Sequence, residues 1–196
     1  MRNSDLWTVF RFLLTVLALA VIGLNLAYNS WRNLFWFSHF ALIMIVVSVW
    51  TGNRMLVSMS AISVLVFHSM WTVIFLLQLF TGLRFGSMGY MFDSQISIFI
   101  RSLSLFHILM PFLIVYLLSR KGYDRRGFFY QTILSFAVFV VSYFVSSTDR
   151  NINWVYGPMS RQEILPQPVY MVLMMVIVPT LVYYPTHRFL KRKFSS

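Results

Sequence analysis

Six apolar blocks follow one another along the chain, and short polar turns separate them. Each block holds about 18 to 26 residues with few charges, the length of a helix that crosses about 30 Å of hydrocarbon. The pattern therefore predicts an all-α, polytopic membrane protein, a bundle of six transmembrane helices that forms one domain over residues 1–196. The predicted spans are roughly 8–28, 33–51, 55–80, 95–119, 128–147 and 168–187.

The overall composition agrees with this class. The chain of 196 residues is 59% hydrophobic and only 11% charged, whereas soluble domains carry about 25% charged residues. Arg2 and Arg11 before the first apolar run are reminiscent of a signal peptide. The following "NLAYNSW" offers no small-residue cleavage site, so we expect this segment to be a mature helix.

The basic residues predict an orientation. If the spans alternate, eleven of the sixteen Lys and Arg residues fall on one side, and such a side is normally cytoplasmic. Both termini would then be cytoplasmic, and we expect a bacterial inner membrane. The net charge of +11 predicts contact with anionic lipid headgroups as partners; no basic soluble domain is present to bind nucleic acid. The eleven residues are Arg2, Arg11, Arg54, Arg120, Lys121, Arg125, Arg126, Arg188, Lys191, Arg192 and Lys193.

The residue types that the predicted spans lack exclude several kinds of chemistry. The chain has no cysteine, which excludes disulfides, a cysteine nucleophile and thiolate metal sites. All five acidic residues lie outside the predicted spans, which argues against a proton-driven pump. We predict neither a metal nor a cofactor.

Polar residues inside the predicted fourth span indicate a site, because such residues are costly in hydrocarbon. His107 lies near the middle of this span. It continues a helical stripe that faces the bundle interior or a water-filled cavity, or it only packs against a serine on a neighbouring helix. The rest of the stripe is Ser94, Ser97, Arg101 and Ser104.

Arg101 needs a partner for its guanidinium. Asp93, just before the span, is one candidate, and the phosphate or carboxylate of a bound lipid is another. The side chain could also extend to the outer membrane surface.

Two further histidines lie in the second and third spans. Ser38 could act as a nucleophile with His107 as its base, while the adjacent His39 is either part of the site or an interfacial residue of the aromatic belt. His68 is near mid-span. Together with His107 it raises a minor alternative, a bis-histidine haem protein.

The fifth span carries its own polar face, which we expect to pack on the stripe of the fourth span. This face is formed by Gln131, Ser135, Ser142 and Ser146. In the loop before it, Asp124 is expected to cap the helix.

The segment "NINWVYGP" lies between the last two spans. Asn151 and Asn153 can donate and accept hydrogen bonds, while Trp154 and Tyr156 suit the membrane–water boundary. The segment is therefore either an interfacial anchor or a lid over a cavity that reaches His107.

Three short pieces, "FWFSHFALI", "FHILMPFLIVYL" and "NINWVYGP", resemble the androgen-induced membrane hydrolase family (FAR-17a type) and the related YwaF-type integral membrane proteins. The resemblance implies that His107 and Pro111 belong to a His-x-x-x-Pro-Phe motif. It also implies that Ser38 stands where the hydrolases have a threonine nucleophile. The pieces cover about 30 residues. The cysteine chemistry of the eukaryotic acyltransferase relatives is not possible in this chain, which lacks cysteine.

Two main functions follow. The first is an intramembrane lipid hydrolase or acyl-transfer enzyme, in which an acyl lipid reaches Ser38 and His107 sideways from the bilayer. Asn153, Trp154 or Arg101 would stabilise the oxyanion. The second is a non-catalytic membrane protein that binds or carries a lipid or small molecule, or is a subunit of a membrane complex.

Overall fold

The computed structural model of the chain describes residues 3–28, 30–84, 86–158 and 160–194, and these residues form helices and connecting turns with no strand among them. Four shorter helical segments accompany the α-helices: 3-10 helices at Trp31–Phe35, Gly86–Phe92 and Ile152–Trp154, and a π-helix at Val178–Tyr183. The α-helices are α1 (Asn3–Tyr28), α2 (Phe37–Thr51), α3 (Arg54–Thr81), α4 (Ile98–Leu103), α5 (Phe106–Lys121), α6 (Arg126–Val145), α7 (Gln167–Ile177) and α8 (Tyr184–Phe194).

Within the described residues, five helical stretches are long and apolar enough to cross a membrane. Two of them are composite, because α4 and α5 together form Ile98–Lys121, and α7, the π-helix and α8 together form Gln167–Phe194. The remaining apolar helix, α2, is shorter, with 15 residues. This architecture indicates an integral multi-pass membrane protein.

The predicted fourth span differs most from the structure. It begins at Ile98, so Ser94 and Ser97 precede the helix and are exposed. A break at Ser104 and Leu105 separates α4 from α5, and there the backbone amide of His107 bonds to the carbonyl of Ser104 over 3.1 Å. The continuous stripe predicted from Ser94 to His107 is therefore wrong, although Ser104 and His107 remain neighbours.

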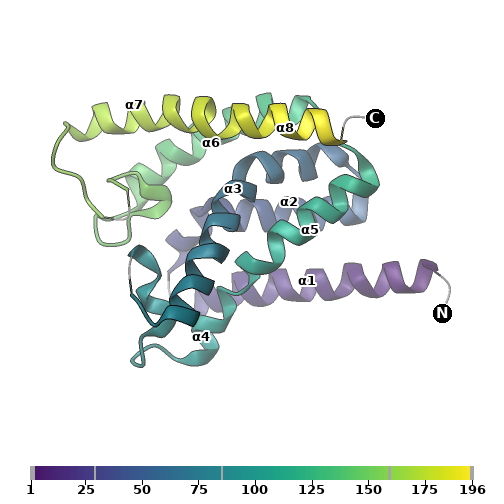
Figure 1. The fold of residues 1–196 in the computed structure, drawn as a ribbon, viewed down its shortest axis with the longest axis horizontal. Helices are drawn as coiled ribbons and strands as arrows, with labels where there is room; N and C mark the ends of the chain where they lie inside the picture. The colour runs from purple at the N-terminus through teal and green to yellow at the C-terminus, as the bar shows by residue number, and fades with distance from the viewer. Residues whose placement is uncertain (1–2, 29, 85, 159, 195–196) are drawn as a thin grey trace.

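Helix α3 is the centre of the bundle. It packs against α2, α5 and α6, and Figure 1 shows it running diagonally between α1 on one side and the α7–α8 line on the other. Small residues allow this close packing, as is common between membrane helices. Ser60 Oγ lies 3.2 Å from the carbonyl oxygen of Ala41 in α2. A Cβ atom added to Gly127 of α6 would lie 2.8 Å from Ser58 Cβ.

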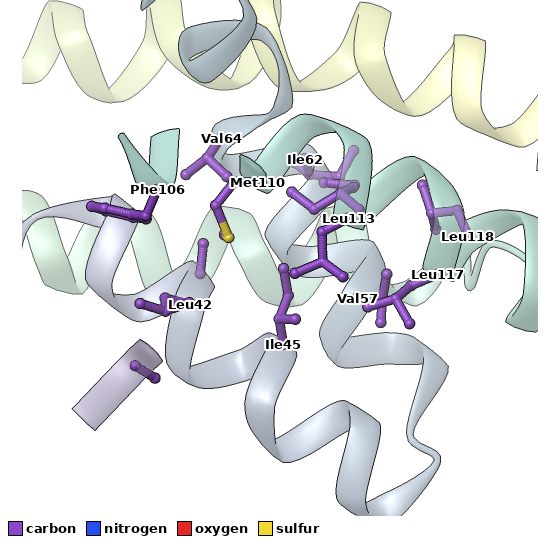
Figure 2. Packing of buried hydrophobic residues seen from close by; sticks show 14 of the residues in the cluster. Leu42, Ile45, Val57, Ile62, Val64, Phe106, Met110, Leu113, Leu117 and Leu118 are labelled. Atoms are coloured by element: carbon purple, nitrogen blue, oxygen red, sulfur yellow. The ribbon is translucent and has the colours of Figure 1, made fainter. Parts of the chain in front are cut away.

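The apolar core fills the space between α2, α3 and α5, and Figure 2 shows these side chains meeting there. All of the labelled residues are buried. They are Leu42 and Ile45 of α2, Val57, Ile62 and Val64 of α3, and Phe106, Met110, Leu113, Leu117 and Leu118 of α5.

The start of α1, the α2–α3 turn, the α5–α6 turn and the end of α8 lie at one end of the molecule (Figure 1). Three contacts tie this basic end together. Lys121 Nζ donates to the Ser48 carbonyl over 2.6 Å, the Tyr123 amide donates to the Phe194 carbonyl over 2.9 Å, and Arg54 lies 3.8 Å from Asp124.

Asp124 was expected to cap α6, but the N-cap position is Arg125. Asp124 lies one residue earlier, and its Oδ1 still accepts the amide of Arg126, the first residue of α6, over 3.0 Å. Its Oδ2 also accepts the Arg126 guanidinium over 2.8 Å. This hydrogen-bonded guanidinium, with Arg54 nearby, holds the pKa of the Asp124 carboxyl below its usual value.

The polar face of α6 was expected to pack on the fourth span, but its bonds lead elsewhere. Gln131 Nε2 donates to Ser135 Oγ over 2.9 Å, and Ser135 Oγ lies 2.9 Å from the Tyr183 hydroxyl in the π-helix. The helix packs on α3. The central position of α3 explains the difference, because α3 occupies the space next to α6.

Candidate functional site

Two cavities meet in the half of the bundle opposite the basic end. One has a volume of about 200 Å³ and mostly apolar walls from α2, α3 and α7; we call it the apolar cavity. The other, of about 500 Å³, has more polar walls from α2, α5 and the turns around Tyr90 and Arg150; we call it the polar cavity. Small-molecule sites typically measure about 300–1,000 Å³. The residues that line both are Trp36, Ser38, Trp71, His107 and Trp154, which we call the junction.

The two residues predicted as a nucleophile and base both lie at this junction. Ser38 is the second residue of α2 and is buried, while His107 is the second residue of α5 and is half-buried. Among the described residues, no hydrogen bond joins Ser38 Oγ to His107. The fold therefore places Ser38 and His107 on a shared cavity wall without a preformed hydrogen bond between them.

The imidazole of His107 is fixed by the break between α4 and α5. Its Nδ1 lies 2.8 Å from the carbonyl oxygen of Ser104. A carbonyl can only accept, so Nδ1 carries the proton in this bond and the neutral ring keeps Nε2 as an acceptor. This tautomer is the one that a general base requires.

A stack of rings also orients His107. Trp71 stacks on His107 with centroids 5.0 Å apart and planes at 21°, and Phe75 stacks on Trp71 at 5.3 Å. Phe92 continues the stack at 5.7 Å from Phe75, and the Arg84 guanidinium covers Phe92 at 3.8 Å. Sequence analysis missed Trp71 and Phe75, although their spacing of four residues on α3 placed them on one helix face.

His39, His68 and His107 gather around Phe106. The rings of His68 and His107 are 4.5 Å apart, and Phe106 lies 4.1 Å from His107, 6.0 Å from His68 and 6.2 Å from His39. Both nitrogens of His39 and Nδ1 of His68 are buried without a hydrogen-bond partner among the described residues. Buried polar atoms without partners are rare in proteins, and they commonly indicate a bound water or ligand.

The distance between His68 and His107 bears on the haem alternative. A haem iron binds one nitrogen of each axial ring at about 2 Å, from opposite sides of the macrocycle. With ring centroids 4.5 Å apart, the two imidazoles leave no room for a macrocycle. Within the described part of the chain, no group of three or more His, Asp or Glu side chains is arranged to hold a metal ion.

Asn153 holds the start of α2 in place. Its Oδ1 accepts the Phe37 amide over 3.0 Å, and its Nδ2 donates to the Phe35 carbonyl over 2.7 Å and to Ser142 Oγ over 2.9 Å. Both Nδ2 hydrogens are therefore used, so Asn153 is not free to donate to an oxyanion. Its role in this geometry is to position the turn that carries Ser38.

The segment around Asn153 is strained. Asn151, Asn153 and Trp154 have φ angles of 40°, 53° and 59°, in the left-handed region that L-residues other than glycine seldom adopt. Such strain persists only where surrounding contacts enforce it, and it is frequent at functional sites.

Asn151 and Tyr156 stabilise the same segment from within. Asn151 Nδ2 donates to the Gly157 carbonyl over 2.7 Å, and its Oδ1 accepts the Tyr156 amide over 2.9 Å. The Tyr156 hydroxyl donates to the Tyr143 carbonyl over 2.9 Å. Trp154 is thus the member of this segment whose side chain is available to a ligand, since it lines both cavities.

Arg101 lies outside the residues that line the two cavities. Its Nη1 donates to the Met91 carbonyl over 3.0 Å. Asp93, one of the candidate partners, instead accepts the Gln95 amide over 2.9 Å. The ion pairs formed within the described residues both involve Asp124. Arg101 therefore supports the turn before α4.

The polar cavity carries groups suited to a polar headgroup. Asp149 and Arg150 line its outer part, and Ser104, Tyr90 and His39 line its inner part. Burial raises the pKa of the Tyr90 phenol, so this group remains a neutral hydroxyl at physiological pH.

Comparisons of the chain with known protein families, with curated proteins and with solved structures find no match. The site is therefore interpreted from its own geometry.

Proposed function

We propose that the protein is an integral membrane enzyme that hydrolyses or transfers the acyl group of a lipid ester, with Ser38 as nucleophile and His107 as general base. One observation carries this proposal: both residues lie where the apolar and polar cavities meet. An amphiphilic ester could place its chain in the first cavity and its headgroup in the second. Its carbonyl would then lie at the junction.

The reaction follows from the state of His107. Ser38 Oγ forms a bond to the ester carbonyl carbon while its proton moves to His107 Nε2, which is the free acceptor. The ester C–O bond then breaks and His107 returns the proton to the leaving alcohol. Water or a second alcohol releases the acyl group from Ser38 by the same steps.

The developing oxyanion needs hydrogen-bond donors. Asn153 is excluded by its existing bonds, and Arg101 lies outside the cavity walls. Trp154 supplies an indole N–H at the junction. The Ser38 amide is the second source, because it has no acceptor among the described residues. The neighbouring amides are used: Phe37 donates to Asn153, and His39 and Phe40 donate to the Trp36 carbonyl.

The motif likeness supports the same assignment. "FWFSHFALI", "FHILMPFLIVYL" and "NINWVYGP" contain Ser38, His107 and Trp154, and these three residues share the junction. We propose distant membership of the androgen-induced membrane hydrolase and YwaF-type superfamily on this basis.

We also propose six membrane passes with both termini in the cytoplasm. Helix α2, at 15 residues, spans about 22 Å. This pass therefore needs the residues before α2 as well, which are the 3-10 helix Trp31–Phe35 and the extended residue Trp36. The arginine and lysine residues concentrated at the basic end support its cytoplasmic placement, and a bacterial inner membrane fits this arrangement.

A second candidate function is lipid binding without catalysis, as a carrier or as part of a complex. The missing hydrogen bond between Ser38 and His107 favours it. A purified protein that retains a lipid but releases no fatty acid would support this candidate over the enzyme.

Turnover in lipid nanodiscs tests the proposal. Release of labelled fatty acid from a panel of monoacyl and diacyl esters should be lost in Ser38→Ala and in His107→Ala. Ser119→Ala is the matched control, since Ser119 is exposed near the basic end and lines neither cavity. Turnover that survives Ser38→Ala would remove this serine from the mechanism.

A further inference from the structure

A third depression lies on the outer surface of α3 beside the apolar cavity. This lateral groove, of about 590 Å³, runs between α3 and α8. Its walls include Val66, Val73, Pro185 and Phe189, and of these Val66, Val73 and Phe189 are exposed apolar side chains. Both helices belong to stretches long enough to cross a membrane, so we expect this groove to face the hydrocarbon of the bilayer.

The groove and the apolar cavity share two residues, Met70 and Ile74. Met70 is 51% exposed although it also lines the internal cavity. The wall between bilayer and cavity is therefore one side chain thick at this point. Methionine is unbranched and changes rotamer readily, so it suits a wall that must open.

The opposite wall of the apolar cavity is also irregular. Val178 lines this cavity and begins the π-helix, and Pro179 follows it. Proline removes a backbone donor, and short π-helical segments are frequent at functional sites. Met174, one turn earlier on α7, completes the wall facing α3.

The polar cavity opens differently. Its outer lining residues Asp149 and Arg150 are exposed on the turn after α6, at the end where the polar loops lie. An amphiphile bound across the junction would thus have hydrocarbon beyond its tail and water beyond its head.

We propose that Met70 and Ile74 form a lateral gate where the groove between α3 and α8 meets the apolar cavity, through which the acyl chain of a membrane lipid passes from the bilayer towards Met174 on the facing wall of that cavity. The inference rests on the lipid-binding part of the proposed function and does not require catalysis. It identifies the substrate as a lipid that remains in the membrane, with its carbonyl drawn inward to Ser38.

The absence of cysteine makes the gate directly testable. Met70→Cys can be modified with a bulky maleimide in nanodiscs without background labelling. Val140→Cys, an exposed position on α6 that lines neither cavity nor the groove, is the matched control. The same modification of Asp149→Cys blocks the opening of the polar cavity instead. Binding is measured with a non-hydrolysable ether analogue that carries a photoreactive group at the chain end.

Modification of Met70→Cys should slow capture of the ether lipid by about tenfold or more, while modified Val140→Cys and unmodified Met70→Cys behave like the unmodified parent. Photoadducts should map to the walls of the apolar cavity.

Slowing by modified Asp149→Cys but not by modified Met70→Cys would overturn the gate and place access on the polar side. A parent protein that captures no lipid would overturn the gate together with lipid binding. Capture without ester turnover would leave the gate intact and remove only the catalytic proposal.

Discussion

The indole of Trp71 stacks on the imidazole of His107, with centroids 5.0 Å apart and ring planes at 21°. The pair joins α3 to α5 at the point where the two cavities meet. Together with the bond from His107 Nδ1 to the Ser104 carbonyl, it fixes both the plane and the tautomer of the imidazole.

Trp71→Ala should therefore reduce ester turnover by about tenfold or more, because an aromatic pair contributes about 0.5–1.5 kcal/mol and small displacements of a catalytic base lower rates strongly. Trp71→Phe should keep most of the activity. Trp50→Ala is the control, since Trp50 bonds to Thr15 near the basic end. Equal activity in Trp71→Ala and the parent would show that the stack does not position His107.

Asn153→Ala should lower the thermal stability and the activity together. It removes all three hydrogen bonds to the start of α2 and to Ser142, and unpaired backbone groups cost about 1–3 kcal/mol each when buried. Asn153→Gly removes the same bonds but suits the φ of 53°, so its unfolding midpoint should lie above that of the alanine variant. Thermal unfolding in detergent measures the midpoints of both variants. Identical midpoints would contradict the assignment of backbone strain at this residue.

Gly127→Leu should destabilise the fold by several kcal/mol, because even a Cβ atom there would lie 2.8 Å from Ser58 Cβ and close to the α3 backbone. Gly23→Leu is the matched control, since a Cβ atom on that α1 residue would have nothing within 4 Å. Loss of folded protein on size-exclusion chromatography is expected only for the first variant. Equal tolerance of leucine at both positions would show that α6 does not cross α3 this closely.

The α5–α6 turn should respond to acid through Asp124. The folded-state pKa of this carboxyl is lowered, chiefly by the hydrogen-bonded Arg126 guanidinium. Its contribution to stability is therefore complete above the unfolded-state pKa of about 3.9 and is lost as the pH falls through the lower folded-state pKa.

Asp124→Asn should lower the unfolding midpoint at pH 7, and the difference from the parent should shrink as the pH falls below about 3.9. Asp93→Asn, in an exposed loop, serves as the control. A difference in unfolding midpoint that grows as the pH falls would mean that folding raises the pKa of Asp124 instead of lowering it.

The all-helical, apolar character of the fold was predictable from the sequence because membrane helices leave a strong signal, whereas the six-span count and the orientation stay predictions. The apolar blocks predicted where the helices lie. The distribution of basic residues predicted which turns lie at the same end, and contacts of Lys121, Tyr123 and Asp124 join these turns in the structure. Breaks inside the helical stretches were harder to predict from the sequence. The interruption at Ser104 and the π-helix at Val178 lie inside continuous apolar stretches, so the pattern of hydrophobic residues does not locate them.

The site was only partly predictable for a similar reason. Intramembrane polarity drew attention to Ser38, His68 and His107, and all three line the apolar cavity; their functional roles stay predictions. It could not show that Asn153 uses its amide to hold α2, because its partners Phe35 and Phe37 lie more than a hundred residues away. Nor could it separate Trp71 and Phe106 from the many aromatic residues that only face lipid.

The most direct test of the account is to locate a covalent adduct. A fluorophosphonate probe reacts with an activated serine by forming an oxygen–phosphorus bond at Oγ and releasing fluoride, with the serine proton taken by the base. The purified protein should gain one adduct by intact mass, mapped by peptide analysis to Ser38, and His107→Ala should lose it. No adduct on folded, lipid-competent protein, or an adduct at another residue, would contradict the assignment of Ser38 and His107 as a catalytic pair.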